Sequence, residues 1–145
     1  MKHLLTALTA WAHAPWHEWM KEEPIWLEVF AELWTKIPES AVLEILKNRL
    51  IVLPPVFMGR IVRIADATAS DTIILQLDLA LLKRPREEAI AILAHELAHI
   101  ICKPSANLQQ NDLDADQLVS NWGLEPELKK ALANDLQPGH LRLRR

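Results

Sequence analysis

The 145-residue sequence has little of several residue types, and each shortage excludes a class of protein. A single cysteine, Cys102, cannot form an internal disulfide, which favours a reducing compartment. Three glycines are too few for a glycine-rich or repetitive scaffold. A net charge of −3 gives no field that would attract a phosphate backbone, so we expect no nucleic-acid partner. No apolar run approaches the ~20 residues that cross a bilayer, so we expect a soluble, cytoplasmic protein without a membrane partner.

Both ends of the sequence leave an alternative open. Met1 to Ala14 loosely resembles a secretory signal, with an apolar stretch followed by small residues. Thr6 and Thr9 interrupt that short stretch, which favours an ordinary amphipathic helix. The basic segment 142–145 is too short to predict a partner.

Half of the residues are apolar and 24 % are charged, as in ordinary globular proteins, and the length fits a single domain over residues 1–145. Helical spacing of apolar residues and helix-starting prolines predict a helical part over residues 1–50. Two strands are expected over 60–65 and 72–77, and Pro54-Pro55 should briefly interrupt regular structure. Further helices are expected at about 85–101, 107–122 (closed by Gly123) and 126–136. The sequence therefore predicts an α+β fold, with a small sheet and additional N- and C-terminal helices.

One segment of the helix predicted at about 85–101 carries chemistry: His95-Glu96-Leu97-Ala98-His99. Histidines four residues apart lie one helical turn apart on one face and can bind the same tetrahedral Zn²⁺. Glu96 follows His95 and can act as general base toward a metal-activated water. The surrounding residues are almost all apolar, so the helix is predicted to be buried, where unpaired histidines would be costly. A metal site is the better interpretation of this pattern, although chance could produce it.

A third ligand is expected from the acidic cluster Asp112-Leu113-Asp114-Ala115-Asp116 on the following helix. Asp112 and Asp116 share one helix face, whereas Asp114 points elsewhere. We therefore prefer Asp112 as the metal ligand, with Asp116 accepting a hydrogen bond from the N–H of a ligand histidine. The alternative, that these acids only complement a helix N-terminus, stays open for each of them.

The segment 95–99 and the acidic cluster 112–116 resemble the corresponding segments of zincin metallopeptidases. The resemblance is closest to the gluzincin branch, which includes the ImmA/IrrE-like and HtpX-like enzymes. The resemblance covers residues 60–123 and implies a catalytic core there. It implies zinc, with His95, His99 and Asp112 as ligands, Asp116 as a supporting residue and Glu96 as the catalytic base. It also implies that strand 72–77 pairs with an extended substrate, although a plain core strand is an equal alternative.

The sequence departs from the family's pattern in two places. Asp112 stands where the family usually has Glu, so its shorter side chain requires a closer helix. Without tyrosine, the chain also lacks the phenol that many zincins direct at the oxyanion. His140 or an arginine could serve instead.

Three other features permit functional interpretations that we do not prefer. Cys102 could bind zinc as a thiolate but is more simply a small buried residue. His13 and His17 are four residues apart, but Pro15 lies between them and breaks the helix. Tryptophans crowd the first 34 residues and should be mostly core, although some could form a surface for a protein partner. These tryptophans are Trp11, Trp16, Trp19, Trp26 and Trp34.

The function predicted from the sequence is that of a zinc metalloendopeptidase, a hydrolase that cleaves a protein or peptide substrate with metal-activated water and Glu96 as general base. The first alternative is an inactive zinc-binding protein of the same fold that acts as an interaction scaffold. The second alternative is a helical interaction domain without metal.

Overall fold

The computed structural model describes residues 1–56, 60–64 and 71–135, and for residues 56, 60–64 and 135 it describes the backbone alone. Among these residues, Pro15 and Pro24 are each the first residue of a helix, because a fixed φ suits the first turn and the missing N–H is not needed there. The α-helices are α1 (Lys2–Ala12), α2 (Pro24–Lys36), α3 (Glu39–Leu46), α4 (Arg86–Ile101), α5 (Leu108–Asn121) and α6 (Glu125–Asp135). Two 3₁₀ helices, η1 (Pro15–Lys21) and η2 (Leu79–Lys83), join them to their neighbours. All the helices predicted from the sequence are present within a few residues of their expected bounds.

The sheet consists of three described strands in the order β1-β3-β2. β1 (Arg49–Val56) runs parallel to β3 (Thr72–Asp78), and β2 (Arg60–Ile64) runs antiparallel to it. Ile73, Leu75 and Leu77 are buried in alternation, as expected for the central strand. The strands predicted at 60–65 and 72–77 are therefore confirmed over the described residues 60–64 and 72–77, while β1 was not predicted.

The prediction for Pro54-Pro55 is correct only in part. Both prolines belong to β1, an edge strand, where a missing N–H is tolerated. The pairing with β3 nevertheless shifts register between Leu53 and Val56, and the Gln76 side chain donates a hydrogen bond to the Pro54 carbonyl. The prolines thus disturb the ladder without ending the strand.

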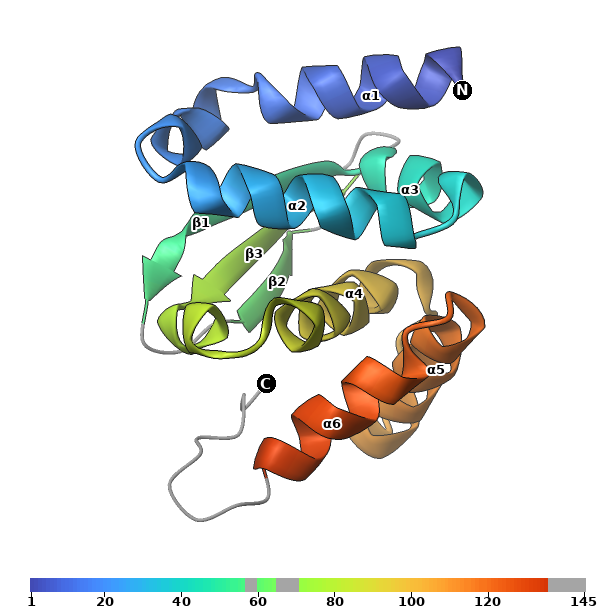
Figure 1. Cartoon of the computed structure of the whole chain (residues 1–145). Helices are drawn as coiled ribbons and strands as arrows, with labels where there is room; N and C mark the ends of the chain where they lie inside the picture. Colours follow the sequence, from blue (N-terminus) through green and yellow to red (C-terminus); the bar gives the residue numbers. More distant parts are fainter. Residues whose placement is uncertain (57–59, 65–70, 136–145) are drawn as a thin grey trace.

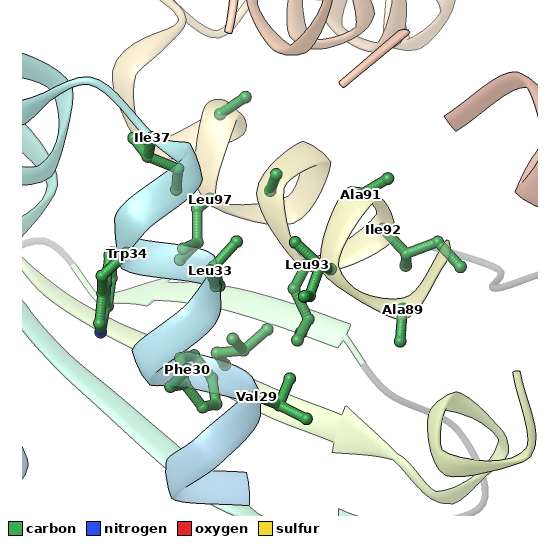
Figure 2. Close-up of a cluster of buried hydrophobic side chains, with 14 of the residues drawn as sticks. Val29, Phe30, Leu33, Trp34, Ile37, Ala89, Ala91, Ile92, Leu93 and Leu97 are labelled. Atoms are coloured by element: carbon green, nitrogen blue, oxygen red, sulfur yellow. The ribbon is translucent and has the colours of Figure 1, made fainter. Parts of the chain in front are cut away.

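The core lies where α2 and α4 pack against each other and against the sheet, which Figure 1 shows behind them. In Figure 2, Leu33 of α2 lies beside Leu93 and Leu97 of α4, and Phe30 lies about one turn earlier on α2. These four side chains are at most 1 % exposed. Within α2, Trp26 is 1 % exposed, whereas the preceding Ile25 is 36 % exposed.

The outer edge of β1 is covered by η1. Trp19 Nε1 donates to the Val52 carbonyl at 3.0 Å, and the Val52 N–H donates to His17 Nε2 at 3.0 Å. His17 Nδ1 lies 2.7 Å from the Trp11 carbonyl. Two side chains thus satisfy main-chain groups that an edge strand would otherwise offer to another strand.

α5 and α6 lie on the side of α4 away from α2 (Figure 1). α5 ends in a Schellman motif, in which Gly123 adopts φ 83° and the Leu124 N–H donates to the Val119 carbonyl. Gly123 was predicted as this cap. α6 is tied to α4 by Asn134, whose Nδ2 lies 3.0 Å from each carboxylate oxygen of the buried Glu88.

The predicted α+β class is confirmed: the protein is mostly helical with a small sheet. No described helix combines the length and the apolar character needed to span a bilayer.

Candidate metal centre

α4 carries the first half of the candidate site. Pro85 precedes it, Glu87 and Glu88 lie in its first turn near the positive end of the helix dipole, and Cys102 ends it in an extended conformation. Twelve of its sixteen residues are buried, including His95 and Glu96. The sequence prediction of a helix buried on nearly every side is confirmed.

His95 and His99 turn their Nε2 atoms toward each other at 3.1 Å, with ring centroids 4.8 Å apart and planes nearly perpendicular. Asp112 reaches this pair from α5, its Oδ1 lying 3.5 Å from His99 Nε2. One potential ligand atom from each of the three residues lies within 4.8 Å of the others. The structure thus brings together the three residues that the sequence selected as ligands.

Two of the three separations in this cluster are close to those expected around a tetrahedral ion. Two ligands at about 2.05 Å from zinc, separated by the tetrahedral angle, lie about 3.3 Å apart. The observed separations of 3.1 Å and 3.5 Å fall on either side of that value. Two imidazoles and a carboxylate are a donor set that zinc takes, and other divalent transition metals take it too.

Asp116 stands behind His95, one turn along α5 from Asp112. Its Oδ1 lies 2.6 Å from His95 Nδ1, the ring nitrogen opposite the one that faces His99. The distance is that of a hydrogen bond, but the geometry falls short of a regular one. A modest rotation of the ring or of the carboxylate would align the pair. A proton held on Nδ1 leaves the Nε2 lone pair for a metal.

Solvent reaches the site from α5. The side chain of His95 is 6 % exposed and that of His99 17 %, whereas that of Asp112 is 50 % exposed. Glu96, in the same turn as His95, is 8 % exposed. The two histidine side chains are therefore largely shielded from solvent, whereas the Asp112 side of the site is open to it.

Two other groups near the site lie outside this cluster. Asp114 accepts a hydrogen bond from Gln110 Nε2 at 2.7 Å on the exposed side of α5. Burial raises the pKa of the Cys102 thiol, and the negative charge of Asp114 raises it further. A thiol held protonated is a poor metal ligand. The preference for Asp112 over Asp114 and Cys102 agrees with this arrangement.

His17 does not form a second site with His13. Both of its ring nitrogens face main-chain groups, and it is 1 % exposed. Burial lowers the pKa of His17 below its ordinary value of 6.5, more than the contact with the Trp11 carbonyl raises it. An Nδ1–H that donates to Trp11 and an unprotonated Nε2 that accepts from Val52 make this a neutral, structural histidine.

The expectation that strand 72–77 binds extended substrate is wrong. β3 is the central strand, and β1 and β2 occupy both of its edges. It therefore has no free main-chain edge along its paired residues, and the alternative of a plain core strand holds.

The N-terminal tryptophans are mostly core, as predicted. Trp11, Trp26 and Trp34 are buried, and Trp19 is partly buried. Trp16 alone among the five is exposed, at 42 %, with the Arg49 guanidinium 6.0 Å from its ring. His140, considered for the oxyanion, lies outside the described residues.

Two polar clusters near α4 were not predicted from the sequence. One is the contact of Glu88 with Asn134, and the other is a set of hydrogen bonds around Asn111 in the turn between α4 and α5. A polar residue inside a helix gives no sequence signal of its partner, because such partners are fixed by tertiary packing.

No protein family, curated protein or solved structure among those compared matches this chain.

Proposed function

We propose that this chain is a zinc-dependent metallopeptidase whose metal is held by His95, His99 and Asp112. The observation that carries the proposal is the convergence of three ligand atoms from two helices within 4.8 Å of one another, two of their separations being close to those around a tetrahedral ion. The Nδ1 side of His95 is turned to Asp116, which favours the tautomer a ligand needs.

The roles of the residues follow from their positions. A bound zinc ion would supply Lewis acidity, which polarises a peptide carbonyl and makes water more acidic. Glu96 would take the proton from the attacking water and pass it to the leaving amine, the usual work of a carboxylate adjoining such a pair. The half-exposed Asp112 side leaves an approach for a peptide.

Glu96→Gln tests the mechanism, because it preserves size and removes the base. We expect the variant to bind zinc with the affinity of the natural protein and to lose hydrolysis of unfolded protein substrates by a factor of at least about 100. Leu113→Ala, on the exposed face of α5, serves as the matched control and should keep both properties. Full hydrolysis by the Glu96→Gln protein would contradict the role given to Glu96.

The alternative is a zinc-binding protein of the same fold that does not cleave. The absence of tyrosine favours it, since no phenol can stabilise an oxyanion. Stoichiometric zinc without hydrolysis of any unfolded substrate by the natural protein would support this alternative over peptidase activity.

A further inference from the structure

The turn between α4 and α5 determines where Asp112 lies. It starts after Cys102, where α4 ends, and reaches Asn107, the N-cap of α5. Asn111 makes two hydrogen bonds to a single residue of this turn. The Ser105 N–H donates to Asn111 Oδ1 at 2.7 Å, and Asn111 Nδ2 donates to the Ser105 carbonyl at 3.0 Å. Because the Asn111 side chain binds both the N–H and the carbonyl of Ser105, it fixes the distance between the two residues and also their relative orientation.

Ser105 is in turn bonded to the start of α5. Its Oγ accepts from the Asn107 N–H at 3.1 Å and donates to the Asn107 carbonyl at 3.0 Å. The Asn107 side chain accepts from the N–H groups of Gln109 and Gln110. The turn and the first turn of α5 therefore form one hydrogen-bonded unit.

Capping does not account for Asn111, because Asn107 already caps α5. The residues of α5 that are buried, Ala115 and Val119, lie one and two turns beyond Asn111. Asp112 lies between these buried residues and the N-cap, and the bonds from Asn111 to Ser105 fasten this end of α5 to the turn.

Small movements of this turn matter to a metal. A carboxylate oxygen about 6 Å from a helix axis moves by about 1 Å when the helix rotates by about 10°. Metal–ligand distances tolerate only about 0.2 Å. Asn111 directly precedes Asp112, so its two bonds restrict the motion that would take Asp112 away from His99.

We propose that Asn111 is a positioning residue, which holds Asp112 within reach of the two histidines through its clamp on Ser105. The inference rests on the proposed metal site. Asn111 itself does not bind the metal, and its effect on affinity passes through Asp112.

A double-mutant cycle on the full chain tests this. Zinc affinity would be measured by competition with a chromophoric chelator for the natural protein, Asn111→Ala, Asp112→Ala and the double variant. We expect Asn111→Ala to weaken zinc binding about 10-fold, as loss of a supporting partner does. In the Asp112→Ala background, Asn111→Ala should cause no further loss. With Co²⁺ as the probe, Asn111→Ala should weaken the visible absorption of the tetrahedral ion, which a loss of stability alone would not do.

Gln117→Ala is the control, because it removes an exposed hydrogen bond between side chains of the same helix. It should leave zinc affinity and the Co²⁺ spectrum unchanged. If Asn111→Ala does not fold, Asn111→Gln keeps the amide on a longer arm and replaces it in the cycle.

The outcomes separate the two proposals. An unchanged affinity in Asn111→Ala, or an equal loss with and without Asp112, would overturn the positioning role and leave the metal site standing. Failure of the natural protein to bind zinc would overturn both. A loss that depends on Asp112 supports the clamp even if no peptide is cleaved.

Discussion

Replacement of His17 by alanine should destabilise the protein strongly, although His17 is far in sequence from the candidate metal site. The buried Val52 N–H would lose its acceptor, and an unsatisfied buried donor costs about 1–3 kcal/mol. Removing the ring also leaves a void against Trp11, whose ring centroid is 4.6 Å away, which adds about 2 kcal/mol. The sum is about 3–5 kcal/mol, a large part of a typical stability of about 5–15 kcal/mol.

Thermal unfolding followed by circular dichroism in the presence of a chelator measures this effect. For a chain of this size, about 2–4 °C are lost per kcal/mol, so the Tm should fall by about 10 °C. His13→Ala is the matched control, because His13 is exposed, and its Tm should change by no more than about 2 °C. Equal shifts in the two variants would refute the argument that His17 joins η1 to β1.

Three further predictions concern pH, a helix cap and the support of a ligand. Because the pKa of His17 is lowered in the folded protein, the folded protein binds fewer protons than the unfolded chain once the pH falls below about 6.5. The stability that His17 contributes is therefore complete above that pH and is lost below it. Tm measured against pH should show this loss in the natural protein and less of it in His17→Gln. Gly123→Ala should lower the free energy of unfolding, measured by chemical denaturation, by about 1–2 kcal/mol, because an alanine at a φ of 83° is strained. No neighbouring atom lies within 4 Å of the new Cβ, so a clash cannot contribute, and an unchanged free energy of unfolding would contradict backbone strain. Asp116→Asn should weaken zinc binding about 10- to 100-fold in a chelator competition, and unchanged affinity would show that Asp116 does not support His95.

The sequence was most informative where chemistry depends on spacing along one helix. His95 and His99 had to share a face once the segment was helical, and a turn of a few residues had to return α5 beside α4. The choice of Asp112 and Asp116 over Asp114 followed from the same periodicity. These predictions needed only local geometry.

Features set by long-range pairing were not predictable in the same way. β1 was missed because Pro54-Pro55 read as an interruption, whereas an edge strand tolerates them. The role given to strand 72–77 failed because strand order cannot be read from one strand's composition. Asn111 gave no signal either, since its partner Ser105 is brought to it by the turn.

The central claim is that His95, His99 and Asp112 together hold one zinc ion. Elemental analysis of the purified full chain, after incubation with zinc and removal of the excess, tests it most directly. We expect one zinc per chain in the natural protein and none in a protein in which both histidines are replaced by alanine, with the apo forms equally folded by circular dichroism. A natural protein that retains no zinc, or a double variant that retains as much, would contradict the account.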